Sequence, residues 1–396
     1  MAHSLQNIQV NKITQSLPIT LRNILALRMT DVHLLMTLLF CLLLHLPAEA
    51  QDLSTSDIKE NEPIKIGLLL TENPSENSLM QEAMDAANLI VDQVNKSGGI
   101  RQKQIRLFMK STDGKWGTGS KQAVSLIFEH QTTALLGFID GRSAHLIEQV
   151  CTKAEIPFIS THSPDPTLSR INIPWYFSTV PLADQQANIL AEHLVRNNFG
   201  KSILIVTSDN YDQGFIRRSF IEMMVNEYHI KSDIFNLNGG KDDFNQIRSV
   251  ISESGTSAIV FFGTSVELEN LTEQLEVGNI EIPVYTSVHN LKRKPPNPFS
   301  NPVFAIRSKN LNTVKKEQFH KDFFDKYGYT PGVYVSYLYD GMQALFEAIR
   351  INGSESHQIR KSLAKMKYKG MNGQITFGSD GVIEQPLTIV KIGGGG

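Results

Sequence analysis

The feature that most constrains the fold is a regular alternation of short apolar runs with longer amphipathic segments between residues 64 and 286. Ile64–Leu70 is such a run, and near-continuous apolar runs of this length are typical of strands buried inside a parallel sheet. It is followed by residues 78–95, in which apolar side chains recur at helical spacing until Gly98 and Gly99 stop the pattern. Strands that alternate with helices of ten or more residues predict βαβ units with helices packed on parallel sheets.

The same unit repeats along the chain. We expect further strands at 105–109, 134–138, 157–159, 202–206, 233–237, 258–262 and 284–285. We expect further helices at 120–129, 143–154, 184–197, 214–226, 243–253 and 265–277. A single open sheet with all these strands would be wide, so two sheets divided near residues 178–181 are the better prediction.

Charge and cysteine content exclude several classes of protein. The chain has 38 basic and 40 acidic residues, and this near-neutral balance argues against a nucleic-acid partner. Two cysteines, Cys41 and Cys151, are too few for a disulfide scaffold or a cysteine-rich metal site. Cys151 shares an apolar helix face with Leu146, Ile147 and Val150, which predicts an ordinary core residue.

The first fifty residues are typical of an export signal. Residues 34–46 are nearly all apolar, a run too short to span a bilayer as a helix, and Ala48-Glu49-Ala50 follows as an A-x-A cleavage pattern. We predict cleavage after Ala50 and an exported, periplasmic protein. The leader is long, and Met29 is an alternative start that would lack the positive residues upstream. At the other end, residues 393–396 are all glycine and are predicted to be a disordered tail.

No catalytic motif accompanies this architecture. The sequence contains no G-x-G-x-x-G after its first strand, no P-loop, no H-E-x-x-H and no G-x-S-x-G. We therefore predict a binding protein rather than an enzyme, with no cofactor and no metal.

Ligands of open α/β sheets lie beyond the carboxyl ends of the strands, so the loops that follow the strands are the candidate site. With two sheets facing each other, the crevice between the lobes becomes the site, and hinge closure traps the ligand. The candidate ligand-binding residues in these loops are Asp140, Gly141, Arg142, Ser143, His162, Ser163, Tyr211 and His289.

Five segments carry a family resemblance in the right order and spacing: residues 94–100 (VNKSGGI), 137–143 (GFIDGRS), 156–160 (IPFIS), 209–214 (DNYDQG) and 370–381 (GMNGQITFGSDG). From about Ile64 to Ile392 the chain resembles type I periplasmic solute-binding proteins of the branched-chain amino acid class, which serve ATP-driven importers. The resemblance implies two Rossmann-like α/β lobes with parallel sheets, joined by three crossover segments near 178–181, 306–308 and 365–368. It implies an N-terminal lobe of residues 61–179 plus 307–365 and a C-terminal lobe of 180–306 plus 366–392.

Departures from the family pattern bear on the ligand. Where amino-acid-binding members carry an Ala-Thr pair for the ligand's polar groups, this chain has Ser163-Pro164, and Pro164 has no backbone N–H. The segment 286–289 lacks the carboxylate that would pair with a ligand ammonium, and Asp212 replaces a glycine in the 209–214 turn. A buried ammonium without a counter-charge is costly, so a plain zwitterionic amino acid is not expected.

Two site residues carry specific hypotheses. Arg142 precedes Ser143 at a predicted helix N-terminus, where a guanidinium beside free backbone amides suits a ligand carboxylate. The alternative is that Arg142 points to solvent or pairs with Asp140. The resemblance places the ring of Tyr211 against the ligand, and the alternative is a surface tyrosine that caps its turn.

The leading functional hypothesis is an exported, monomeric protein that captures a small polar or carboxylate-bearing solute for the permease of an ABC importer. The alternative is a sensory protein that binds a ligand and signals to a membrane partner.

Overall fold

The computed structural model describes residues 62–75, 77–113, 117–170, 174–199, 202–239, 243–288 and 301–392. The expected leader with its cleavage site, the glycine tail and the candidate residue His289 all lie outside these described residues. The chain divides into two compact units, Met1–Glu62 and Pro63–Gly396, and every element below belongs to the second unit. No helix among the described residues has both the length and the apolar character needed to cross a membrane.

The first sheet has five parallel strands in the order β2-β1-β3-β4-β5. Their bounds are β1 Ile64–Leu70, β2 Ile105–Ser111, β3 Leu135–Phe138, β4 Phe158–Ser160 and β5 Tyr176–Ser178. Side chains alternate between the two faces of a strand, so Ile66 and Leu68 enter one hydrophobic cluster and Leu69 another. Both faces of the sheet are therefore buried under helices.

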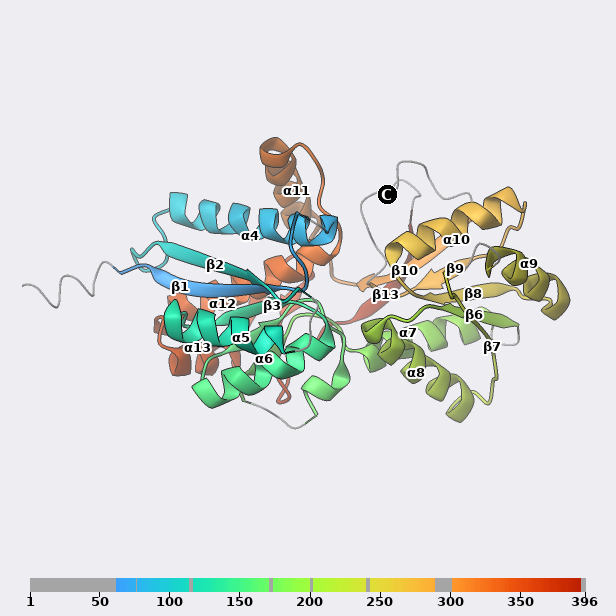
Figure 1. The fold of residues 1–396 in the computed structure, drawn as a ribbon, viewed down its shortest axis with the longest axis horizontal. Helices are drawn as coiled ribbons and strands as arrows, with labels where there is room; N and C mark the ends of the chain where they lie inside the picture. The colour runs from blue at the N-terminus through green and yellow to red at the C-terminus, as the bar shows by residue number, and fades with distance from the viewer. Residues whose placement is uncertain are drawn as a thin grey trace, which may run out of the picture. The chain divides into compact units, whose positions relative to one another are not determined.

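The helices on these two faces come from distant parts of the chain. Helix α4, Ser78–Lys96, packs with α12, Tyr334–Asn352, in the cluster that contains Leu68, and Figure 1 shows α4 running along β1 and β2. Helices α5, Thr118–Val124, and α6, Gly141–Ala154, supply the cluster on the other face, where Cys151 is fully buried as expected for a core residue. A single π-helical turn, Ser125–Glu129, continues α5.

The second sheet has six strands in the order β13-β10-β9-β8-β6-β7, and only β13 runs antiparallel to its neighbour. The bounds are β6 Ile203–Thr207, β7 Asp233–Asn236, β8 Ala258–Phe262, β9 Val284–Thr286, β10 Val303–Ser308 and β13 Leu387–Ile392. Ile203 and Ile205 pack under α7, Ala183–Arg196, and α8, Tyr211–Asn226. Leu204 and Val206 pack on the opposite face, beside α9, Asp243–Ser254, and α10, Ser265–Val277 (Figure 1).

The C-terminal part of the chain is divided between the two sheets. It contains α11 Thr313–Tyr327, α13 Ser356–Leu363 and the two-stranded pair β11 Tyr368–Lys369 and β12 Gln374–Ile375. Met371, Ile375 and Phe377 belong to the hydrophobic cluster of the first sheet, whereas the family resemblance implied that 366–392 belongs to the lobe of the second. Only β13 joins the second sheet, and the lobe boundaries as a whole stay a prediction.

The predicted α/β fold class with parallel-sheet lobes is confirmed, but two helices that carry site residues begin earlier than expected. Helix α6 starts at Gly141 rather than Ser143, because the Asp140 side chain accepts a hydrogen bond from Ser143 N and caps the helix. Helix α8 starts at Tyr211 rather than Gly214, because Asn210 accepts from Gln213 N in the same way. Strand β5 was not predicted, since its three residues are too few to show a periodic pattern.

Candidate functional site

Three loops that follow strands β3, β4 and β6 meet at one place. The first leads into α6, the second runs through residues 161–165 to a short 3-10 turn, Pro166–Leu168, and the third leads into α8. The first two loops belong to the first sheet and the third to the second sheet. The candidate site is therefore built where the predicted geometry requires, at the carboxyl ends of parallel strands.

Asp212, in the first turn of α8, is the central link between these loops. Its Oδ1 accepts a hydrogen bond from the backbone N–H of Gly141 at 3.1 Å and another from Ser163 Oγ at 3.0 Å. Only 5% of Asp212 is exposed, so both hydrogen bonds lie away from solvent. A side chain of helix α8, which packs on the second sheet, thus binds the N-terminus of α6 and the hydroxyl of Ser163, both on the first sheet's side of the junction.

The close approach of the β4 loop to α6 requires a glycine at position 141. A Cβ atom there would lie 2.8 Å from Asp165 Oδ2 and 2.9 Å from Ser163 Oγ, closer than van der Waals contact allows. The absence of a side chain leaves the Gly141 amide open to Asp212 while the next capping bond, from Ser143 N to Asp140 Oδ1, stays intact. Position 141 therefore requires glycine, because any side chain there would collide with Asp165 and Ser163 of the β4 loop.

Asp165 connects a second set of polar groups. It is fully buried, accepts hydrogen bonds from Thr167 N and Thr167 Oγ1, and has His145 Nε2 at 3.2 Å from its Oδ2. Burial alone would raise the pKa of Asp165, but the hydrogen bonds from His145 and Thr167 outweigh it and lower this pKa. The hydrogen bond to Asp165 raises the pKa of His145, which favours a charged imidazolium beside the carboxylate.

Tyr211 and Arg142 lie together at the edge of this cluster. The Tyr211 hydroxyl donates a hydrogen bond to Asp165 Oδ2 at 3.3 Å, and burial raises its pKa to about 12, helped by the nearby carboxylate of Asp165. The Arg142 guanidinium lies 5.1 Å from the centre of the Tyr211 ring and 3.4 Å from Asp140 Oδ2, and 65% of its side chain is exposed. The structure thus places Arg142 in the paired arrangement that was its alternative interpretation.

His162 lies in the loop after β4, and its ring packs against two aromatic residues. Its ring stacks on Tyr334 at a centroid distance of 4.7 Å and meets Phe138 edge-on at 4.8 Å. Burial lowers the pKa of His162 to about 4, so the imidazole is neutral at pH 7. Its Nδ1 lies 3.9 Å from Asp212 Oδ2.

The local field at this junction is negative. Burial raises the pKa of Asp212 to about 7, and the neighbouring Asp140 and Asp165 carboxylates add to that rise. Glu148, about two turns along α6 from Asp140, likewise has its pKa raised to about 7 by burial. Among the residues that the structure describes, no three histidine, cysteine or acidic side chains are grouped so that they would hold a metal ion.

The structure brings seven of the eight predicted site residues into this junction, and His289 lies outside the described residues. Sequence reasoning did not assign a site role to Asp212, although its replacement of a glycine in the 209–214 turn was a visible signal. His145 and Tyr334 were also missed, because an isolated histidine or tyrosine on an amphipathic helix carries no local signature of its partners.

Comparison with curated sequences finds a partial relative. Glutamate receptor 3.7 of Arabidopsis thaliana is 26% identical over 155 residues, which is 39% of this chain. The aligned part is 16% of the receptor, so the chain corresponds to about a sixth of that protein's length.

Several solved structures share the fold. The branched-chain amino acid transporter substrate-binding protein LivJ of Streptococcus pneumoniae, in complex with isoleucine, has a TM-score of 0.71 at 20% identity and covers 83% of this chain and 100% of its own. A solute-binding protein of an ABC transporter from R. palustris, in complex with benzoate, has a TM-score of 0.72 at 15% identity, covering 84% and 94%. A third, from Rhodopseudomonas palustris BisB5 with 3,4-dihydroxybenzoic acid, has a TM-score of 0.70 at 17% identity, covering 83% and 93%.

The family assignment rests on nearly the whole chain after the first unit. A family model described as periplasmic binding protein matches residues 63–396, which includes both sheets and all three loops of the candidate site. The chain belongs to the periplasmic binding protein family.

Proposed function

We propose that this protein captures a small polar or carboxylate-bearing solute at the junction of the β3, β4 and β6 loops and delivers it to the permease of an ABC importer. The observation that carries this proposal is the meeting of two helix N-termini, those of α6 and α8, where loops of the two sheets come together. Free backbone N–H groups and the helix dipole make each N-terminus favourable for a negatively charged group. Family membership supports binding rather than catalysis as the role of this junction.

The ligands named for three similar structures carry the functional group that we propose for the ligand of this protein, a carboxylate. Isoleucine, benzoate and 3,4-dihydroxybenzoic acid, bound by three of those proteins, all carry a carboxylate. The proposed site adds a guanidinium, Arg142, at the exposed edge of the α6 N-terminus. Because Arg142 is paired with Asp140 in this structure, we propose that a ligand carboxylate draws the guanidinium away from Asp140 when it binds.

Thermal-shift screening followed by calorimetry tests the proposal. The panel should contain L-isoleucine, L-leucine, benzoate and 3,4-dihydroxybenzoate, each matched with an analogue that lacks the carboxylate, such as leucinol or benzamide. We expect at least one carboxylate to bind and its analogue without the carboxylate to bind ten or more times more weakly. Binding of the analogues with equal affinity would contradict a carboxylate-specific site.

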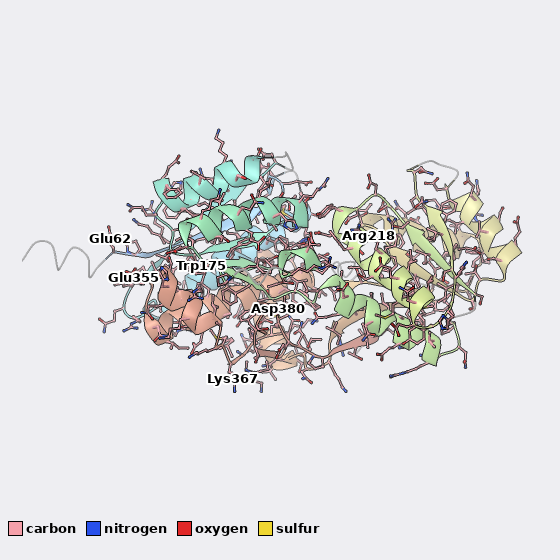
Figure 2. The ribbon with its side chains drawn as sticks, turned by 90° about the horizontal axis from the view of Figure 1, so that it is seen from below. Glu62, Trp175, Arg218, Glu355, Lys367 and Asp380 are labelled. Carbon is pink, nitrogen blue, oxygen red and sulfur yellow. The ribbon has the colours of Figure 1, made fainter. Side chains whose placement is uncertain are left out.

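Arg142 is tested in the same assay with a matched control. Arg218 on α8, labelled in Figure 2, is also exposed. It too lies over an aromatic ring, that of Phe215 at 4.4 Å, but it is outside the three loops. We expect Arg142→Ala to weaken carboxylate binding about tenfold or more and Arg218→Ala to leave it unchanged. Unaltered affinity in Arg142→Ala would show that Arg142 is a surface residue.

A sensory role is the second candidate, and the partial similarity to a plant glutamate receptor is the observation that favours it. In that case the loaded protein would signal to a membrane partner instead of releasing its ligand to a permease. Uptake of the radiolabelled ligand by cells with and without the gene separates the two roles. Loss of uptake in the deletion strain supports transport, whereas unchanged uptake with a lost response to the ligand supports sensing.

We propose that the protein is exported to the periplasm after removal of its first fifty residues. The apolar run at 34–46 and the Ala48-Glu49-Ala50 pattern support this proposal. Mass spectrometry of the protein recovered from the periplasmic fraction should find an N-terminus at or within a few residues of Gln51. An intact leader on the recovered protein would contradict it.

A further inference from the structure

Two donors of the first sheet form a small carboxylate-binding site in this structure. The Gly141 amide is the first N–H of helix α6, and Ser163 Oγ approaches it from the β4 loop. Both donate to the same oxygen, Asp212 Oδ1, and Ser163 Oγ also accepts a hydrogen bond from Asp165 N at 3.2 Å, which fixes its position. A helix N-terminal amide together with a fixed hydroxyl is a suitable pair of donors for a carboxylate.

The occupant of this site is a side chain that comes from the other sheet. Asp212 lies in the first turn of α8 and reaches the site from a helix that packs on strand β6 of the second sheet. The neighbouring Tyr211 makes a parallel contact, to Asp165 of the same loop. Two consecutive residues of α8 therefore hold the two sheets together through groups that a free ligand with a carboxylate and a hydroxyl would also use.

The internal carboxylate is held by neutral donors. The group near its second oxygen is His162, whose imidazole is uncharged at neutral pH because burial lowers its pKa. The Asp140 carboxylate disfavours a negative charge on Asp212 and so adds to the rise of its pKa. Within the part of the chain that the structure describes, no lysine or arginine forms an ion pair with Asp212, so the two hydrogen bonds must offset the lost hydration of its carboxylate and hold it weakly.

We propose that Asp212 is an internal carboxylate which closes the junction when no ligand is bound, and that a ligand's carboxylate competes with it for Gly141 N–H and Ser163 Oγ. This inference rests on the proposed function in one respect, that the ligand carries a carboxylate. In this proposal, competition by the Asp212 side chain lowers the affinity of the junction for a ligand carboxylate. The part of the proposal that concerns closure does not depend on any ligand.

The first test measures carboxylate affinity with the competitor removed. Benzoate and L-isoleucine are titrated by calorimetry into the wild type, Asp212→Ala and Asp212→Asn. We expect Asp212→Ala to bind at least one probe ten or more times more tightly than the wild type, and Asp212→Asn to lie between them because its amide keeps one acceptor oxygen. Adding Ser163→Ala to Asp212→Ala should remove most of that gain, because it deletes one of the two donors.

Asp184→Ala is the matched control for these variants. Asp184 is the second residue of α7, as Asp212 is of α8, so its replacement removes the same carboxyl side chain from the first turn of a helix on the same sheet. Its partner is Ser219, on α8 and outside the three loops. Asp184→Ala should leave probe affinity at the wild-type value.

The second test measures closure without ligand, by small-angle X-ray scattering of the purified protein. We expect a larger radius of gyration for Asp212→Ala than for the wild type and Asp184→Ala. If Asp212→Ala opens but neither protein binds any probe, closure by Asp212 stands and the proposed carboxylate ligand fails. If Asp212→Ala neither opens nor binds the probes more tightly, the inference is overturned.

Discussion

The hydroxyl of Tyr211 donates a hydrogen bond to Asp165 Oδ2 at 3.3 Å and so joins the first turn of α8 to the loop after β4. Asp165 is fully buried, its Oδ1 accepts a hydrogen bond from Thr167 N, and His145 Nε2 lies 3.2 Å from the same Oδ2 that Tyr211 contacts. Tyr211 therefore docks onto a carboxylate whose position is already fixed. Such a contact restricts the geometry of the junction more than a hydrogen bond to a mobile side chain would.

We expect Tyr211→Ala to weaken binding of the cognate ligand by about 1–3 kcal/mol, which is about 5- to 150-fold, because it removes both a ring and a hydrogen bond. Tyr211→Phe keeps the ring under Arg142 and loses only the hydroxyl, so its effect should be smaller. Calorimetry with the ligand found by screening measures both. An affinity within a factor of about two of the wild type in Tyr211→Ala would show that the ring does not touch the ligand.

Gly141→Ala tests whether the junction depends on close packing at the start of α6. The new methyl group would lie within 3 Å of Asp165 and Ser163, so these side chains must move. We expect a loss of about 1–3 kcal/mol in the free energy of unfolding, measured by urea denaturation. Gly214→Ala is the control: nothing lies within 4 Å of a Cβ there, and alanine favours the helix by about 1 kcal/mol. Equal stability changes in both variants would contradict this account.

His162 should make the protein less stable as the pH falls. Its pKa is about 4 in the folded protein and near 6.5 when unfolded, so the unfolded chain binds the extra proton between these values. The stability that the neutral ring contributes is fully present above about pH 6.5 and is lost as the pH falls towards 4, by up to about 3 kcal/mol. His162→Phe keeps the stack on Tyr334 and cannot titrate.

The measurement is the difference in free energy of unfolding between the wild type and His162→Phe at pH 7, 6, 5 and 4. We expect the wild type to lose stability relative to the variant as the pH falls. Substitution of the exposed His357 by phenylalanine is the control and should give a difference that does not follow this trend. If the difference in free energy of unfolding between wild type and His162→Phe did not change with pH, the His162 ring would titrate alike in the folded and unfolded states, which would contradict this account.

Asp340 connects helix α12 to the C-terminal segment, and its loss should destabilise the fold. The buried carboxylate accepts hydrogen bonds from Met371 N, from Asn372 N at 2.9 Å and from Asn372 Nδ2 at 3.0 Å. Asp340→Ala leaves the backbone N–H groups of Met371 and Asn372 buried without this acceptor, while Asn372 Nδ2 keeps its hydrogen bond to Ser336 Oγ. The loss should cost about 3 kcal/mol in the free energy of unfolding.

Urea denaturation of Asp340→Ala, Asp340→Asn and the exposed control Asp325→Ala tests this role. Asp340→Asn should fall between wild type and Asp340→Ala, because its amide oxygen still accepts but its NH₂ group faces other donors. A loss in Asp340→Ala no larger than that in Asp325→Ala would contradict the structural role.

Patterns in the amino-acid sequence were enough to predict the α/β class and most of the helices and strands. Runs such as Ile64–Leu70 are buried on both faces, so every residue except the half-buried Lys65 is apolar or small, and the hydrophobic pattern identifies them without tertiary information. The loops of the site follow from the same reasoning, because ligands of open α/β sheets lie at the carboxyl ends of parallel strands. Gly141, Ser163 and Tyr211 were therefore located by the positions of their strands.

Which of these residues contact each other could not be predicted from the sequence, because the contacts join loops of two different sheets. Asp212 and Ser163 are 49 residues apart and belong to different sheets, and no local pattern states that one accepts a hydrogen bond from the other. The placement of Met371 and Ile375 in the first cluster was hidden for the same reason, since an apolar residue near a chain crossing fits either core. Hydrophobic periodicity reports which face of an element is buried, whereas the partner on that face depends on how distant elements pack.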